Sequence, residues 1–164
     1  MKDKIWYEMV HTKFGDNYLA GYLSRQKRTR KLFKIFTLIF STSGVFGWAF
    51  WEYIPIIACG LIALMQLVTL IENQIVPSDQ DIDDIAGLRN KYIQYFNKLE
   101  RLWIDFQNNN ITEQTACEQF YQLRQTIGAD IQETDNKLNI NGNITLVKKK
   151  ADLETTNYIN QYHS

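Results

Sequence analysis

The sequence has few of the residues that build disulfide frameworks or metal centres. Its two cysteines, Cys59 and Cys117, lie in an apolar run and in a polar segment, so they do not describe a disulfide framework. The two histidines, His11 and His163, lie near opposite ends, and no Cys/His cluster has zinc spacing. A glycine-rich phosphate loop and a nucleophile elbow are also absent from the sequence. We therefore expect a protein without a metal or cofactor that is not an enzyme.

Positive charge is missing from a long central stretch. No lysine or arginine occurs from residue 35 to residue 88, although nine precede this gap and nine follow it. Inside the gap, two apolar runs, 35–51 and 54–71, are separated only by Glu52 and Tyr53. As helices they would each span roughly 26 Å, which approaches the thickness of a bilayer core. The sequence therefore predicts a transmembrane helical hairpin.

The charges beside this hairpin predict its orientation. The first 34 residues hold nine lysines and arginines against three acids, and six of the nine lie from Arg25 to Lys34. Positive charge close to a membrane segment marks the cytoplasmic side, so both termini are expected in the cytoplasm. Cleavage as a signal peptide is not expected, because the run begins late and ends in aromatic residues.

The flanking segments have the periodicity of helices. Residues 1–31 have apolar faces on both sides of a break expected at 15–17, and Ser78 or Asp79 would cap the helix that follows Pro77. That helix carries a heptad stripe, which needs partners on one side. The stripe contains Ile85, Leu88, Tyr92, Tyr95, Leu99, Leu102 and Phe106, and is widened by Phe96 and Trp103.

A second cytoplasmic helix is predicted after the asparagines at 108–110. Thr112 would cap it, and its inner face would contain Ala116, Phe120, Leu123, Ile127 and Ile131. We thus expect an all-α membrane protein that assembles as a homo-oligomer. Its parts are a cytoplasmic N-terminal segment (1–31), the hairpin region (32–76), a cytoplasmic helical hairpin (77–138) and a weakly helical or partly ordered tail (139–164).

Small and polar residues recur on the predicted membrane helices. Thr37, Ser41 and Gly44 share one face of the first helix, which favours close helix packing over a pore wall. On the second helix, the amide of Gln66 needs a hydrogen-bond partner. It could bond a neighbouring helix and so stabilise helix packing, or it could contact water in a pore. Its face contains Cys59, Ala63, Gln66 and Asn73. Because two helices cannot enclose a channel, any pore requires several copies of the chain.

Two basic clusters are candidate anion sites. The lysines and arginines nearest the bilayer are expected to fix topology and contact anionic lipid. Arg25, Lys27 and Arg28 lie further out and could bind phosphate groups. A solvated tail is the favoured interpretation of the lysines at 148–150. The acidic run at 79–84 lacks the glycine and glutamate of a calcium loop, so it is interpreted as a helix start.

Taken together, the stretches 25–31, 33–51, 54–71 and 84–106 resemble the SLATT family of two-transmembrane bacterial effectors associated with nucleotide signalling and anti-phage defence. The resemblance covers about residues 1–135. It implies an inner-membrane protein whose oligomer forms a pore. Opening the pore would depolarise the infected cell and cause growth arrest or death. It also implies control by a nucleotide or oligonucleotide from a companion nucleotidyltransferase.

Our leading hypothesis is accordingly a gated homo-oligomeric channel, for which we guess a tetramer. The alternative is a non-conducting membrane scaffold that recruits a cytosolic partner through the heptad helix.

Overall fold

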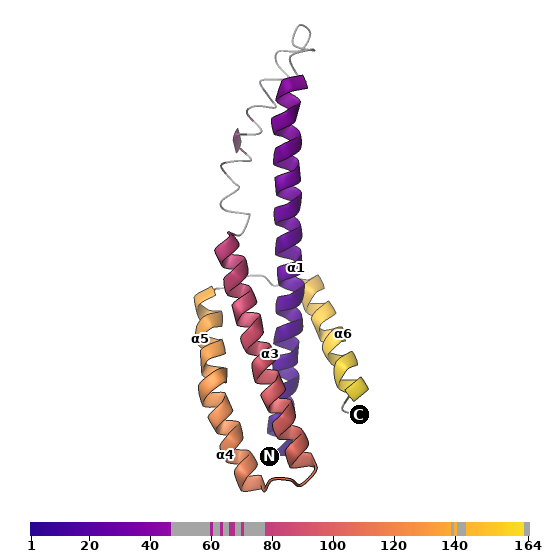
Figure 1. Cartoon of the computed structure of the whole chain (residues 1–164). Coiled ribbons are helices and arrows are strands. Elements are labelled where there is room, and N and C mark those ends of the chain that lie inside the picture. Colours follow the sequence, from indigo (N-terminus) through magenta and orange to yellow (C-terminus); the bar gives the residue numbers. More distant parts are fainter. Residues whose placement is uncertain are drawn as a thin grey trace. The chain divides into compact units, whose positions relative to one another are not determined.

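The computed structural model describes residues 1–46, 60, 63, 66, 67, 70, 78–138, 140 and 144–162, without the side chains of residues 40–46. All secondary structure in these residues is helical, which confirms the predicted all-α class. A five-residue π-helical turn, η2 (Arg124–Gly128), joins two of the helices. The helices in Figure 1 are α1 (Lys2–Phe46), α3 (Asp79–Gln107), α4 (Glu113–Leu123), α5 (Ala129–Leu138) and α6 (Thr145–Tyr162).

The chain divides into two compact units. Unit 1 contains Met1–Leu23 and Asp83–Ser164, and unit 2 contains Ser24–Ile82. Much of the predicted hairpin, including residues 47–59, lies outside the described residues. Within the part of the chain that is described, no helix combines the length and the apolar character needed to cross a membrane.

In unit 1, α1 and α3 pack antiparallel to each other. The rings of Trp6 and Trp103 lie 5.1 Å apart, whereas Arg89, earlier in α3, bonds Asp16, later in α1. The buried residues of α1 are spaced three or four apart, as on one face of a helix. They are Ile5, Met9, Thr12, Asp16, Leu19 and Leu23. One face of α1 is therefore buried continuously from Ile5 to Leu23.

The break expected at residues 15–17 is wrong, because α1 runs through them without interruption. Tertiary contacts outweigh the low helix propensity of these residues. Gly15 leaves room for the ring of Tyr92, and Asp16 binds Lys13 and Arg89. Residues that favour a turn in the sequence, Gly15 and Asp16, thus form contacts between α1 and α3 in the fold.

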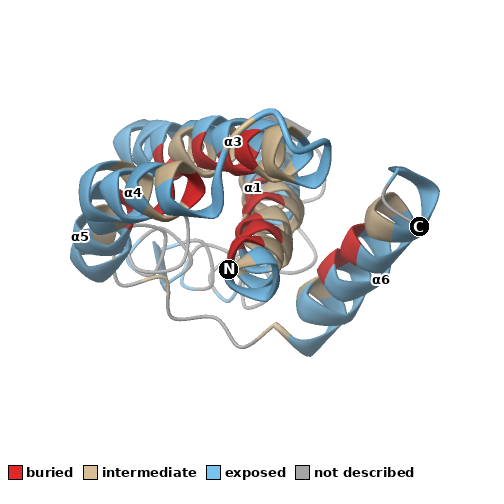
Figure 2. Cartoon of the chain, turned by 90° about the horizontal axis from the view of Figure 1, so that it is seen from below, coloured by how far each residue is buried: buried red, intermediate tan, exposed pale blue. Residues whose placement is uncertain are grey.

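The heptad stripe of α3 is confirmed as a buried face. All its residues are buried or half-buried, and Leu88 and Leu99 are fully inaccessible. Seen from below (Figure 2), buried residues lie where α1, α3 and α4 face one another. The stripe therefore finds its packing partners within the same chain.

The helix starts follow the predicted capping chemistry. Ser78 caps α3, because its Oγ accepts a bond from the N–H of Asp81, whose Oδ2 in turn accepts one from the N–H of Ser78. Thr112 caps α4 by accepting from the N–H of Thr115. Between α3 and α4, Asn109 adopts a positive φ of 56°, which asparagine tolerates better than most residues. The predicted end of the heptad helix near residue 108 is thereby confirmed.

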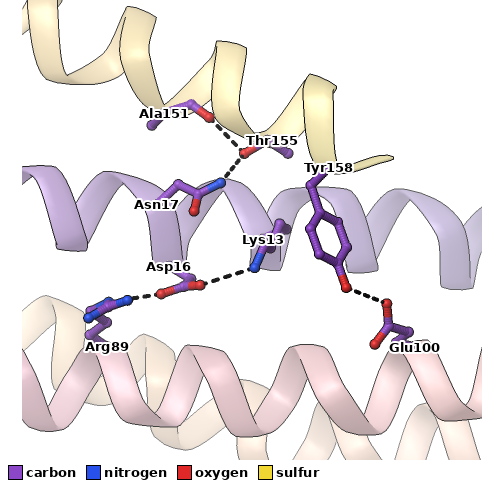
Figure 3. A network of polar contacts seen from close by, with 8 residues as sticks. All are labelled: Lys13, Asp16, Asn17, Arg89, Glu100, Ala151, Thr155 and Tyr158. Carbon is purple, nitrogen blue, oxygen red and sulfur yellow. Dashed lines mark hydrogen bonds and ion pairs between the residues drawn. The ribbon is translucent and has the colours of Figure 1, made fainter. Parts of the chain in front are cut away.

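The expected tail contains an 18-residue helix, α6, that belongs to unit 1. Ala151 and Thr155 are its buried residues. Figure 3 shows the amide of Asn17 donating to Thr155 Oγ1 at 3.0 Å, and the hydroxyl of Tyr158 donating to Glu100 at 2.9 Å. Polar contacts thus connect α6 to both α1 and α3.

Candidate functional site

A cavity of about 330 Å³, open to solvent, lies at the surface of unit 1 between the N-terminal part of α1, the middle of α3 and the η2–α5 segment. Its volume falls within the range of small-molecule sites. The polar residues of its wall are Glu8, His11, Thr12, Tyr92, Tyr95, Arg124, Gln132 and Asp135. Of its charged residues, Arg124 and Asp135 are exposed and Glu8 is half-buried. Three separate stretches of sequence thus contribute polar groups to one cavity.

The π-helical turn places Arg124 and Gly128 in the cavity wall. Thr126 supports the turn, because its hydroxyl donates to the carbonyl of Gln122 at 2.8 Å. The turn also brings Gly128 next to Tyr95, whose hydroxyl oxygen would lie 3.4 Å from a Cβ atom at position 128. Single π-helical turns occur frequently at functional sites, which makes this cavity the strongest candidate in the described residues.

The two tyrosines of the wall are held as neutral phenols. The hydroxyl of Tyr95 donates to Oε1 of Glu8 at 3.1 Å. Burial raises the pKa of Tyr95 far above its ordinary value, with the negative charge of Glu8 adding to the effect and Arg124 opposing it. Burial also raises the pKa of Tyr92 to about 12, helped by the charges of Asp135 and Glu8. Burial is therefore the main reason that both phenols stay neutral, and the nearby carboxylates add to it.

Gly15 fixes the position of Tyr92 in the wall. A Cβ atom at position 15 would lie only 2.3 Å from Cε1 of Tyr92, a distance that real contacts do not reach. The ring can therefore lie against the backbone of α1 only because this residue has no side chain. The shape of the cavity depends on a glycine that does not itself line it.

The predicted phosphate-binding residues lie at different angles around one helix. Arg25, Lys27 and Arg28 are all exposed on α1 in unit 2. At about 100° per residue, Arg25 and Arg28 lie roughly 60° apart around the helix, whereas Lys27 lies roughly 160° from Arg25. Arg25 and Arg28 are therefore the pair best placed to contact the same small anion.

Nearby, Arg30 is committed to an ion pair with Asp79 at the start of α3. Its Nη2 donates to Oδ2 of Asp79 at 2.6 Å, and Nη1 approaches Oδ1, so the pair is bidentate. Arg30 precedes the first apolar run and Asp79 follows the second. Both residues belong to unit 2, so the two ends of the apolar region meet.

The candidate pore or packing residues are only partly described. Thr37 is half-buried in α1, and the same helix contains Ser41 and Gly44, whose side chains lie outside the described ones. Ala63 and Gln66 are helical and exposed. Cys59 and Asn73 lie outside the described residues.

The sequence contained no signal for the cavity. Tyr92 and Tyr95 were assigned to the heptad stripe, which is correct as far as burial goes. Glu8, Arg124 and Asp135 stand in no motif, and they meet only because η2 and α5 pack against α1 and α3. A π-helical turn has no recognisable pattern in a single sequence, so this site could be found only in three dimensions.

Comparison of the chain with models of protein families, with curated proteins and with solved structures found no match. The SLATT resemblance therefore stays a prediction.

Proposed function

We propose that the chain crosses the bacterial inner membrane as a helical hairpin within residues 32–76, with both termini in the cytoplasm. One observation carries this proposal: the segments before and after the apolar runs fold together in unit 1. Asp16 bonds Arg89 and Glu8 bonds Tyr95, so residues on both sides of the runs share one folded body. A segment whose two ends belong to one such body must cross a membrane an even number of times, and the two runs supply two crossings.

Arg30 and Asp79 support the same topology. Their bidentate pair joins the residues immediately before and after the apolar region, as expected where a hairpin leaves and re-enters one membrane surface. The excess of lysine and arginine before the first run favours the cytoplasm as that side.

The proposed activity is that of a homo-oligomeric, SLATT-like pore that depolarises the cell during phage infection and causes growth arrest or death. Thr37, Ser41 and Gly44, together with Gln66, would line the pore or pack its helices. A nucleotide or oligonucleotide from a companion nucleotidyltransferase would gate it. The resemblance in layout supports this activity. Since α3 is covered within the chain, its stripe supports neither a tetramer nor the scaffold alternative.

Conductance measurements test the pore. Full-length protein reconstituted in planar bilayers should pass current, and Gln66→Leu should change the conductance. Gln119→Leu, an equivalent change at an exposed position of α4, is the matched control and should leave it unaltered. Protein that inserts but never conducts, with or without nucleotides, would reject the pore in favour of a scaffold.

Topology is tested separately with reporter fusions in bacteria. Green fluorescent protein at either terminus should fluoresce, whereas alkaline phosphatase there should be inactive. Active phosphatase at one terminus would contradict the hairpin, independently of any result on conductance.

Lys27 serves as the control for ligand binding at Arg25 and Arg28, because it lies at a different angle around α1. Reversing the charges of Arg25 and Arg28 together should abolish binding of a phosphate-containing ligand. Lys27→Glu reverses a charge that lies roughly 160° from Arg25 and 100° from Arg28 around α1, and should leave that binding intact. Equal effects of the two changes would reject the arginine pair as a site and indicate a general effect of net charge.

A further inference from the structure

We propose that the cavity between α1, α3 and the η2–α5 segment binds a small organic cation of the aliphatic amine class, with Glu8 and Asp135 as its anionic partners and Tyr92 and Tyr95 as its aromatic wall. This inference concerns unit 1 alone and does not depend on the membrane topology or on the pore.

The charges of the cavity wall favour a cation. Glu8 and Asp135 bring two carboxylates from different helices, against the single guanidinium of Arg124. Glu8 accepts one bond from Tyr95, which leaves other lone pairs on its carboxylate for an ammonium group. Burial is the main cause of the raised pKa of Tyr92, and the charges of Asp135 and Glu8 add to it, so both carboxylates act on this part of the wall. An anion would meet two like charges here.

The remaining wall favours an organic cation over a metal ion. Tyrosine rings attract alkylammonium groups through their faces, and Ala129 and Ile131 provide apolar surface for a short carbon chain. In the described residues, no group of three His, Cys, Asp or Glu side chains is arranged to hold a metal. A bare divalent ion would therefore lack ligands, whereas an amine needs only one carboxylate at each nitrogen.

Arg124 then has the role of a specificity-determining residue. Its guanidinium lies in the wall of the same cavity and repels any cation that enters. Removing this charge should therefore strengthen amine binding, whereas removing either carboxylate should weaken it. Partial unfolding would weaken amine binding in every variant, so stronger binding in one variant and weaker binding in the others cannot be explained by loss of structure.

Isothermal titration of the full-length chain in non-ionic detergent, with putrescine as the probe, tests the proposal. Glu8→Gln, which keeps an acceptor for Tyr95, and Asp135→Asn should each raise the Kd by about tenfold or more. Arg124→Gln should lower the Kd several-fold. Glu113→Gln, at a carboxylate that does not line the cavity, should leave it unchanged.

Three results would overturn the proposal. The first is that putrescine gives no binding heat with the folded chain. The second is binding that none of the three cavity substitutions alters, because the ligand would then lie elsewhere. The third is that glutamate or inorganic phosphate binds instead and loses affinity on Arg124→Gln, which would make the cavity an anion site. Circular dichroism of every variant shows that the helices are retained.

Discussion

Arg89 donates from Nε to Oδ1 of Asp16 across 2.9 Å, and this bond joins α3 to α1 over 73 positions of sequence. The same carboxylate accepts from Lys13 through Oδ2 at 3.4 Å, and its side chain is only 8% exposed. Figure 3 shows Asp16 between these two cations. A nearly buried acid thus holds together the two segments that flank the apolar runs.

Replacing Asp16 with alanine should destabilise unit 1. The change leaves two cations near a buried position without their acceptor, but Lys13 and Arg89 are partly exposed and can reach water. We therefore expect a loss of about 1–3 kcal/mol in the free energy of unfolding. Urea unfolding followed by circular dichroism measures this loss.

Glu133→Gln is the control for that measurement. Glu133 pairs with Lys137 on the exposed surface of α5, where solvent screens the interaction, so no measurable change is expected. If both substitutions left the unfolding midpoint unchanged, the Asp16 network would not stabilise the unit.

Gly15→Ala should destabilise the chain, although alanine is the better helix former. Its Cβ would lie 2.3 Å from the Tyr92 ring, so the ring must leave its position or α1 must shift. Forced shifts of this kind cost about 1–3 kcal/mol against the roughly 1 kcal/mol gained in helix propensity, so we expect a net loss of up to about 2 kcal/mol. Thermal or urea unfolding of the full chain measures the net effect.

The matched variant is Gly87→Ala in α3, where an added Cβ meets no atom within 4 Å. Here only the propensity changes, so stability should rise by about 0.5–1 kcal/mol. Two glycine-to-alanine changes in helices are thus expected to have opposite signs. The same sign for both would mean that Tyr92 does not pack against Gly15.

The helices of unit 1 were predictable wherever apolar periodicity or capping residues were strong. Ser78, Thr112 and the stripe of α3 were located correctly from sequence alone. In α1 the same periodicity was hidden, because Thr12 and Asp16 occupy two positions of the buried seam. Polar residues at core positions look like solvent-facing residues until their partners are known. The continuity of α1 through residues 15–17 therefore could not be inferred.

Stability should decline at alkaline pH because the folded state raises the pKa of several tyrosines, among them Tyr158 and Tyr92. Burial, followed by the hydrogen bond and charge of Glu100, raises the pKa of Tyr158 from 10.0 to about 12, and the pKa of Tyr92 also rises to about 12. A raised pKa means that the folded state favours the neutral phenol. This stabilisation is complete below pH 10, where the unfolded chain is also protonated, and is lost as the pH rises from 10 to 12.

Urea unfolding between these two pH values measures the decline. Tyr158→Phe cannot ionise, so its stability should fall less steeply with pH than that of the native chain. Tyr7→Phe, at a position 72% exposed, should follow the native curve. Identical slopes for all three proteins would contradict the assignment to Tyr158.

The cavity was beyond prediction for a different reason. Its carboxylates, Glu8 and Asp135, are 127 positions apart and belong to separate helices. They line one cavity because the fold of unit 1 brings the η2–α5 segment to α1 and α3. The apolar periodicity of a sequence indicates which face of each helix is buried. It does not indicate which polar residues, at the borders of these buried faces, come together from different helices.

The docking of α6 should be the weakest helical contact in unit 1. Ala151 and Thr155 are its buried residues, whereas Leu146 and Leu153 are 80% and 61% exposed. Docking therefore depends on the ring of Tyr158 and on polar bonds such as that from Asn17 to Thr155, each of which water can replace. We expect the amides of α6 to exchange hydrogen faster than those of α3 near Leu99, because few buried apolar contacts mean easier local opening.

Gly21→Ala provides a directed test of this docking. Its Cβ would approach Cγ1 of Val147 to 2.9 Å, so the stiff, β-branched side chain of Val147 must turn or α6 must move away from α1. Hydrogen exchange measured by mass spectrometry should accelerate in α6 while the central part of α3 remains protected as before. Asn157→Ala, at an exposed position of α6, should leave both rates unchanged. Faster exchange throughout unit 1 in the Gly21 variant would instead mean that α6 unfolds together with the α1–α3 pair, because docking and core packing would then be one cooperative unit.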